Sequence, residues 1–453
     1  MSKIQEAKKL LKQYFGYDEF RQGQEQLIEA ALNGQDVLGI MPTGAGKSLC
    51  FQIPALMMDG ITLVISPLIS LMKDQVGTLN QAGIHAAFLN SSLTQGQYHT
   101  ALKYAMQGRY KIIYVAPERL ETEGFINFAL NSGVKISMLA VDEAHCVSQW
   151  GQDFRPSYLK ILEFLKKLPY RPVLTAYTAT ATAEVRDDIM DILNLRDPFV
   201  LTTGFDRENL YYAVKRPRDK YRELLSYLKE KEEKMPGSSG IIYCLSRKNV
   251  EEVCYQLRED GFSVTRYHAG LSDEERKENQ EDFIYDRKQI MVATNAFGMG
   301  IDKSNVRWVI HYNLPKSIES FYQEIGRAGR DGMPSDTLLF YSLGDLILLT
   351  KFATESNQQS INLEKLQRMQ QYAEANICRR RILLSYFGEK VEKDCGNCDV
   401  CRNPPEQFDG TIIVQKALSA IARTGEQIGT SMLIDILRGS FSSELVERGY
   451  EKL

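Results

Sequence analysis

The stretch DVLGIMPTGAGKS, from Asp36 to Ser48, joins a short apolar run to a glycine-rich turn. The apolar run has the length of a buried strand. The turn offers small residues, successive backbone N–H groups, a lysine and a serine, which bind the phosphates of a nucleotide and its Mg²⁺ when they lie between a strand and a helix. We call residues 41–48 the phosphate loop. An ordinary strand-to-helix turn is the alternative.

Four further apolar runs follow within Asp36–Thr203, and they alternate with helical stretches. These runs are ITLVIS, KIIYVA, SMLAVD and PVLTAYTA. Such alternation predicts a parallel sheet with helices on both faces. Because ligands bind beyond the carboxyl ends of parallel strands, we expect the polar segments PTGAGKS, SPLISL, APERL, DEAH and TATAT to share one edge.

A second alternating region extends from Phe205 to Tyr341, with the runs GIIYCL, SVTRYHA, QIMVAT, WVIHYN and TLLFYS. It predicts a second parallel sheet, and thus two lobes that face one another across a cleft. The segment EKEEKMPGSSG, Glu230 to Gly240, is predicted to be an exposed loop. After Leu343 the pattern becomes helical.

Composition limits the class of protein. The 453 residues are 43% hydrophobic and carry a net charge of −3, which is typical of a globular protein and unlike a protein that coats nucleic acid non-specifically. A local basic groove stays compatible with this charge, and the clusters Lys215–Arg218 and Arg379–Arg381 are candidates. No apolar run is long enough to predict a membrane span. The N-terminus lacks the apolar region of a secretion signal.

An acidic pair follows the apolar run Ile136–Val141 in the segment VDEAH. We expect Asp142 to hold Mg²⁺ and Glu143 to orient the attacking water. Acidic residues are also favourable at a helix N-terminus, which is the alternative explanation.

Two arginines lie about 190 residues further on, in QEIGRAGR. Their spacing of three places Arg327 and Arg330 on one side of a helix, from which one or both reach the γ-phosphate, with Gln323 nearby. A solvated basic helix face is the alternative. It does not explain Gly326 and Gly329, because glycine weakens a helix.

Three side chains after the acidic pair suit contact with unstacked bases. Trp150, Phe154 and Arg155 lie in the polar segment SQWGQDFRPSY, and bases stack on aromatic and guanidinium faces. Aromatic residues are more often part of a core. The polar neighbours favour an exposed loop that senses a nucleic acid strand.

The eight cysteines fall into two groups. Cys378, Cys395, Cys398 and Cys401 supply four thiolates, the number that a tetrahedral structural Zn²⁺ requires. An iron–sulfur cluster, a disulfide or chance are the alternatives. The remaining cysteines lie in apolar contexts and are predicted to be buried thiols, namely Cys50, Cys146, Cys244 and Cys254.

These motifs together resemble the RecQ family of DNA helicases, in superfamily 2. The resemblance covers nearly the whole chain, and SQWGQDFRPSY is its family-specific element. Ala45 stands where the family usually has glycine, and Gln152 where it commonly has histidine. The other matching segments are FGYDEFRQGQ, SPLISLMKDQ, VDEAH, TAT, YHAGL, VATNAFGMGIDK and QEIGRAGRDG.

The resemblance implies an α/β fold with two RecA-like lobes, residues 1–204 and 205–344. A helical zinc-binding subdomain, 345–405, and a partial winged helix, 406–453, would follow. Residues after Phe408 resemble the start of that winged helix, and Leu453 ends the chain before a whole wing and before a helicase-and-RNase-D C-terminal domain.

The resemblance also implies roles for individual residues, with ATP, Mg²⁺ and Zn²⁺ as cofactors. By this resemblance, adenine would be recognised by Tyr17, Arg21 and Gln24, and the arginine finger would be Arg330. The nucleotide is held by Thr43, Gly44, Gly46, Lys47 and Ser48, with Ser48 and Asp142 on Mg²⁺. Candidates to contact the phosphate backbone of DNA are Ser66, Lys73, Gln75, Thr294 and Asn295.

We therefore expect an ATP-dependent helicase that moves 3′ to 5′ on single-stranded DNA and unwinds duplexes in repair or recombination. Expected partners are single-stranded and duplex DNA and a single-strand-binding protein, with a monomeric, cytoplasmic chain that is nucleoid-associated in a bacterium or nuclear in a eukaryote. The alternatives are an RNA helicase and an ATP-switched DNA-binding or annealing protein.

Overall fold

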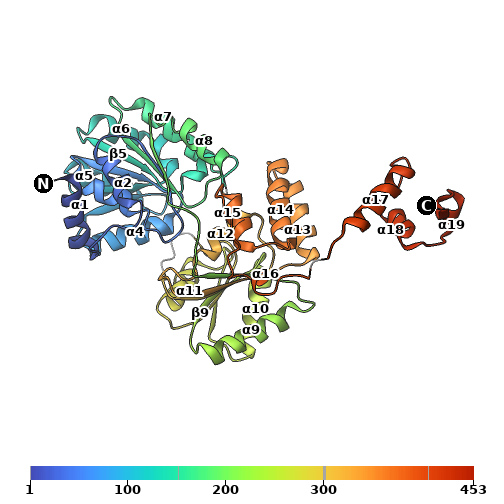
Figure 1. Ribbon diagram of the computed structural model, residues 1–453. Helices are drawn as coiled ribbons and strands as arrows, with labels where there is room; N and C mark the ends of the chain where they lie inside the picture. The colour runs from blue at the N-terminus through green and yellow to red at the C-terminus, as the bar shows by residue number, and fades with distance from the viewer. Residues whose placement is uncertain (1, 152, 299–302, 407, 453) are drawn as a thin grey trace. The chain divides into compact units, whose positions relative to one another are not determined.

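The apolar runs of the first half form a seven-stranded parallel sheet in the computed structural model, which describes residues 2–151, 153–298, 303–406 and 408–452. The strand order is β3-β4-β2-β5-β6-β1-β7. In Figure 1 this sheet, with β5 labelled, lies among the blue and green helices of the first half of the chain. Alternate residues belong to different cores, as with Leu63 and Val64, so helices cover both faces. The strands are β1 (Val37–Ile40), β2 (Ile61–Ile65), β3 (Ala86–Leu89), β4 (Ile112–Val115), β5 (Ile136–Val141), β6 (Val173–Thr178) and β7 (Phe199–Thr202).

A six-stranded parallel sheet of order β10-β11-β9-β12-β13-β8 follows, which confirms the predicted α/β class. Its strands are β8 (Leu210–Lys215), β9 (Ser239–Tyr243), β10 (Val264–Tyr267), β11 (Ile290–Ala293), β12 (Val306–His311) and β13 (Ser335–Phe340).

Three strands, β3, β7 and β8, were not predicted, and each lies at the edge of its sheet. An edge strand has a neighbour on one side only, and these three strands are less completely buried than the central strands β2 and β5. In β7 the exposure alternates along the whole strand.

The prediction of a loop over Glu230–Gly240 was wrong over most of its length. Helix α9 (Lys220–Lys234) continues through the charged residues, and β9 already begins at Ser239. Glu230 and Lys234 form an i,i+4 ion pair at 2.6 Å. Glutamate and lysine favour helix, so only the residues from Met235 to Ser238 form the connection.

The helices around the two sheets fall between the strands, and further helices follow β13. The α-helices before β8 are α1 (Lys3–Leu10), α2 (Gln24–Leu32), α3 (Leu49–Met57), α4 (Ile69–Gln81), α5 (Gln95–Met106), α6 (Glu123–Asn131), α7 (Lys160–Lys167) and α8 (Ala183–Ile192). The later ones are α10 (Arg247–Glu259), α11 (Asp273–Ile284), α12 (Ile318–Ile325), α13 (Leu343–Thr354), α14 (Gln359–Glu374), α15 (Arg379–Tyr386) and α16 (Asp399–Arg402). Short η turns are Leu11–Phe15, Pro117–Glu121, Ala144–Val147, Pro156–Leu159 and Tyr450–Lys452.

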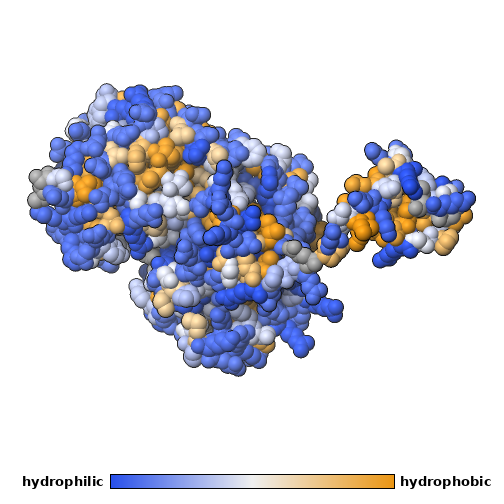
Figure 2. All heavy atoms as spheres, viewed as in Figure 1, coloured by the Kyte–Doolittle hydropathy of each residue, from blue (hydrophilic) through white to orange (hydrophobic). Residues whose placement is uncertain are grey.

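The chain divides into two compact units, Met1–Asn403 and Pro404–Leu453. The second unit contains α17 (Thr411–Arg423), α18 (Thr430–Arg438) and α19 (Ser443–Glu447). Helix α17 exposes the apolar side chains of Ile412, Ile413, Val414 and Leu418, within the hydrophobic surface of this unit in Figure 2. None of the described helices has the length and apolar character that spanning a bilayer requires.

We predict that Gly240→Ala destabilises the second sheet. Gly240 lies opposite Trp308 in the β9–β12 ladder, and a Cβ atom here would lie 2.0 Å from the indole ring. Overpacking of this kind costs about 1–3 kcal/mol. Gly77→Ala in α4 is the matched control, since a Cβ there meets nothing within 4 Å and gains about 0.5–1 kcal/mol. Denaturant unfolding measures both, and equal stabilities would contradict the packing argument.

Candidate functional site

The phosphate loop joins β1 to α3, as predicted. Gly44 and Gly46 have φ angles of +86° and +80°, which favour glycine, whereas Ala45 is not among the residues with positive φ. The alanine is therefore compatible with the loop. Lys47 donates from Nζ to the carbonyl oxygen of Met41 at 3.3 Å.

Two of the three residues predicted to recognise adenine contact this loop. Gln24 is buried and donates from Nε2 to the carbonyl oxygens of Ala45 and Gly46, at 3.0 Å each. Its Oε1 accepts from the backbone N–H of Arg21 at 2.8 Å, and the Arg21 guanidinium donates to the Gly44 carbonyl. The third, Tyr17, is 53% exposed, so its ring is free to stack on a planar ligand.

The acidic pair lies at the carboxyl end of β5. The Asp142 N–H donates to the Ile65 carbonyl of β2 at 2.9 Å, and its carbonyl accepts from Tyr158 at 3.0 Å. Burial raises the pKa of the Asp142 carboxyl group to about 7; Glu143 adds to the rise, and Lys47 opposes it. A buried carboxylate of this kind is stabilised by a bound cation, so the site fits Mg²⁺.

His145, the last residue of VDEAH, received no role from the sequence, although the motif contained it. Its Nδ1 lies 2.9 Å from Thr178 Oγ1 at the end of β6 and 3.3 Å from Glu143 Oε2. Burial lowers the pKa of His145, which favours the neutral imidazole. The imidazole thus links Glu143 to the TAT segment, where the Thr178 hydroxyl also accepts from the N–H of Thr180 at 3.2 Å.

The arginines do not share a helix face, which corrects the prediction. Helix α12 ends at Ile325, and the residues from Gly326 to Arg330 form turns; we call them the arginine turn. Gly329 has a φ of +57°, which ends the helical path.

The arginine turn lies against the phosphate loop. The Cγ atom of Arg330 is 3.4 Å from the place where Gly44 would carry a Cβ, and Thr43 Cβ is at the same distance from such a position on Gly326. Gln323 and Arg327 are buried.

Arg327 is directed toward the second sheet. Burial raises the pKa of Tyr243, and the adjacent Arg327 opposes this rise through its charge and a hydrogen bond. The Tyr243 hydroxyl also donates to the Phe297 carbonyl at 2.9 Å. The two arginines therefore have different surroundings, and Arg330 is the one beside the phosphate loop.

The aromatic loop, residues 146–155, presents Trp150 with 41% of its surface exposed, so this ring is not part of a core. Phe154 and Arg155 are half-buried. Arg155 Nη1 donates to the Pro67 carbonyl at 2.8 Å. Gln152 lies outside the described residues.

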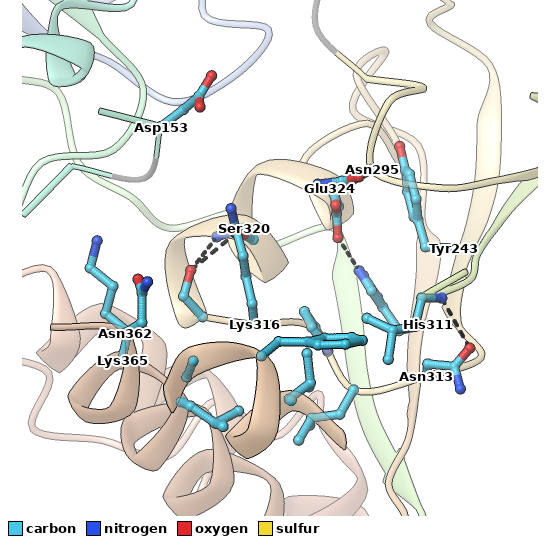
Figure 3. Close-up of a pocket in the computed structure, with 18 of the residues that line it drawn as sticks. Asp153, Tyr243, Asn295, His311, Asn313, Lys316, Ser320, Glu324, Asn362 and Lys365 are labelled. Carbon is cyan, nitrogen blue, oxygen red and sulfur yellow. Dashed lines mark hydrogen bonds and ion pairs between the residues drawn. The ribbon is translucent and has the colours of Figure 1, made fainter. Parts of the chain in front are cut away.

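A cavity of about 460 Å³ lies next to the aromatic loop (Figure 3). Lys365 of α14 donates from Nζ to the Gly151 carbonyl at 2.7 Å, across one side of it. On another side His311 Nε2 lies 2.7 Å from Glu324 of α12. The lining includes Asp153, Phe154, Asn295, Lys316, Ser320, Asn362 and Lys365. The cavity thus mixes two lysines with the carboxylates of Asp153 and Glu324 and with apolar side chains.

The other residues expected on the DNA backbone fall into two groups. Lys73 and Asn295 are exposed, and Gln75 is half-buried and bonded to Gln52 at 3.0 Å. Thr294 and Ser66 are buried. Ser66 has no exposed surface, so it does not present its hydroxyl to a strand in this structure, which corrects that expectation.

The four clustered cysteines come together, with their sulfur atoms within 4.8 Å of one another. Zn–S bonds of about 2.3 Å in a tetrahedron place sulfurs about 3.8 Å apart, so the cluster fits Zn²⁺ with little adjustment. The N–H groups of Cys395, Asn397 and Cys401 donate to three of the sulfurs at 3.3–3.4 Å. The other four cysteines are buried thiols, as predicted.

The cluster Arg379–Arg381 is not a DNA-contacting face, which corrects the prediction for two of its members. Arg379 is buried and pairs with Asp399 at 2.9 Å. Arg380 is buried and donates to the Leu210 carbonyl of β8 at 2.7 Å. Arg380 thus fastens the zinc region to the second sheet, and Arg379 braces the zinc region internally.

Comparisons with known proteins match four family models along the chain. The matched families are the DEAD/DEAH box helicase (residues 21–189), the helicase conserved C-terminal domain (219–332), the RecQ zinc-binding family (343–402) and the RQC domain (404–453).

Among curated relatives, the ATP-dependent DNA helicase RecQ of Haemophilus influenzae is 46% identical over 459 residues, which cover 100% of this chain and 73% of that protein. That of Bacillus subtilis is 44% identical, over 99% of this chain and 76% of that one. Among solved structures, the DEAD-box helicase Mss116 bound to ssRNA shares the fold, with a TM-score of 0.63 and 17% identity over 79% of this chain and 76% of that chain.

We predict that Cys398→Ala removes zinc and loosens the edge of the second sheet. Cys398 forms an isolated β-bridge with Tyr212 of β8, and the Asp399 carboxylate accepts from the Val214 N–H at 2.9 Å. Loss of the metal is therefore expected to disturb β8 as well. Because zinc binding contributes to folding, we expect the first thermal transition to fall by more than about 5 °C. Metal analysis and calorimetry are the measurements. Cys254→Ala is the control and keeps its zinc; full zinc in Cys398→Ala would refute the assignment.

Proposed function

Because the chain belongs to the RecQ family of ATP-dependent DNA helicases, we propose that ATP is hydrolysed between its two parallel-sheet regions and that this moves the protein 3′ to 5′ along one DNA strand. The observation that carries the proposal is the contact of Arg330 with Gly44. It brings a cation from the second sheet to the loop that holds the phosphates in the first. Charge that develops on the γ-phosphate is stabilised by such a cation.

The residues around the phosphate loop have different roles in ATP hydrolysis. Lys47 and the loop amides hold the β- and γ-phosphates, Ser48 and Asp142 hold Mg²⁺, and Glu143 orients the attacking water. Thr43, Gly44 and Gly46 shape the loop, while Tyr17, Arg21 and Gln24 recognise adenine. Gln323 and Arg327 support Arg330 from α12 and the arginine turn.

DNA binds beside this site. The exposed ring of Trp150 stacks on bases, with Phe154 and Arg155 in the same loop. The phosphate backbone of DNA is contacted by exposed Lys73 and Asn295, with Gln75 and Thr294. Such contacts carry no sequence information.

The remaining proposals follow from family membership. We assign the regions 1–204 and 205–344 to the two helicase lobes, 345–405 to the zinc-binding subdomain and 406–453 to winged-helix sequence. The protein acts on single-stranded and duplex DNA in repair or recombination, as a monomer, beside a single-strand-binding protein. Its compartment is that of the DNA, in the cytoplasm of a bacterium or the nucleus of a eukaryote.

The first test is phosphate release from Mg-ATP, titrated with single-stranded DNA and with RNA of matching sequence. We expect strong stimulation by DNA alone, and no release from Lys47→Ala with either strand. Equal stimulation by RNA would favour an RNA helicase. Hydrolysis that neither strand stimulates would favour an ATP-switched binding or annealing protein.

The second test concerns the aromatic loop. We predict that Trp150→Ala binds ATP normally but loses about tenfold of its stimulation by DNA, since one stacked base contributes about 1–3 kcal/mol. Tyr255→Ala removes an aromatic ring that is 65% exposed on α10 and is the matched control. Nucleotide binding and stimulated phosphate release are measured together. An equal loss of both in Trp150→Ala would make Trp150 a packing residue.

A further inference from the structure

The connection between the two sheets contains an arginine that the sequence patterns did not single out. Arg207 lies between β7 and β8, and its guanidinium donates to four carbonyl oxygens. Nη2 bonds the carbonyls of Ala328 and Gly329 at 2.8 and 2.9 Å. Nη1 bonds those of Gly326 and Thr43 at 3.3 and 3.4 Å. Three acceptors belong to the arginine turn and one to the phosphate loop.

The arginine turn needs such a donor because its carbonyls lie beyond the end of α12 and have no helix that continues to supply donors. Leaving buried carbonyls unpaired is unfavourable. Asn209 assists Arg207 by donating from Nδ2 to the Gly329 and Met333 carbonyls, at 2.9 Å each. The Gly329 N–H in turn donates to the Val306 carbonyl at 2.8 Å, which fastens the turn to β12.

Arg207 is itself held in place through Phe205, two residues before it. The Phe205 ring is buried and stacks on Phe387 with centroids 4.5 Å apart. The Phe205 carbonyl accepts from the hydroxyl of Tyr322 on α12 at 2.7 Å. The connection and α12 therefore move as one piece, and Arg207 keeps a fixed position relative to the arginine turn.

We propose that Arg207 is a positioning residue for Arg330: its planar fork fixes the carbonyls of the arginine turn and joins them to Thr43 of the phosphate loop, so that Arg330 is held at the distance from the γ-phosphate that hydrolysis requires. The guanidinium is directed at backbone carbonyls and not at the nucleotide. The inference rests on the proposed role of Arg330.

The test is the rate of DNA-stimulated ATP hydrolysis in Arg207→Gln and Arg207→Lys. A lysine carries the charge but lacks the fork that bonds four carbonyls at once. We expect kcat to fall by about tenfold in Arg207→Gln and by less in Arg207→Lys, with KM for ATP and the Kd for ADP within about twofold of the parent. Binding of ADP with aluminium fluoride, which mimics the transition state, weakens by the same factor as kcat.

A double variant separates positioning from an independent effect. If Arg207 acts through Arg330, Arg207→Gln adds nothing to the loss already caused by Arg330→Ala. Losses that multiply would overturn the inference. So would a parallel loss of kcat and ADP binding, which marks a merely structural role.

Further variants test whether the effect on kcat is specific to Arg207. Arg222→Gln removes an exposed arginine of α9 and is expected to behave as the parent. Should Arg207→Gln fail to fold in a thermal scan, Asn209→Ala replaces it and is expected to lower kcat in the same direction. An unchanged kcat in Arg330→Ala would refute the proposed role of Arg330. A slow Arg330→Ala beside a fully active Arg207→Gln would refute the positioning role alone.

Discussion

The parallel ladder between β1, β6 and β5 is the constraint on which the active site depends. Ile40 at the end of β1 pairs with Thr178 of β6, and Ala176 of β6 pairs with Val141 of β5. This register brings the phosphate loop, the TAT segment and the acidic pair to one edge, although the sequence separates them by up to about 140 residues. Parallel pairing determines that all three leave the sheet in the same direction.

Burial gives this edge its electrostatic character. Asp142 and Glu143 are adjacent in the chain, and burial raises the pKa of the Asp142 carboxyl group to about 7, with the charge of Glu143 adding to the rise. A divalent cation opposes this rise by favouring the charged form of Asp142. The local electrostatics at Asp142 are therefore sensitive to Mg-ATP.

The sequence predicts the interior of this protein better than its edges and turns. Strands such as β2 and β5 are buried on both faces, so their apolar runs are unmistakable, whereas β7 shows half of its residues to solvent. The spacing of Arg327 and Arg330 predicted one helix, but Gly329 ends that path. Arg379 and Arg380 have the composition of a DNA-binding patch, and only their partners reveal a structural role. Charge in a sequence does not tell whether its partner is a ligand or a neighbouring backbone.

The same limit applies to the contacts between the aromatic loop and the acids, which come from distant segments of the chain. Gly151 packs so closely on His145 that a Cβ would lie 2.0 Å from the His145 carbonyl, and Lys365 holds the Gly151 carbonyl from α14. His145 in turn contacts Glu143. Trp150 is the chain neighbour of Gly151, so its exposed ring lies one residue from this close backbone contact. The aromatic loop is therefore tightly packed near the acids and exposed at Trp150, which are the two properties that the proposed sensing of DNA requires.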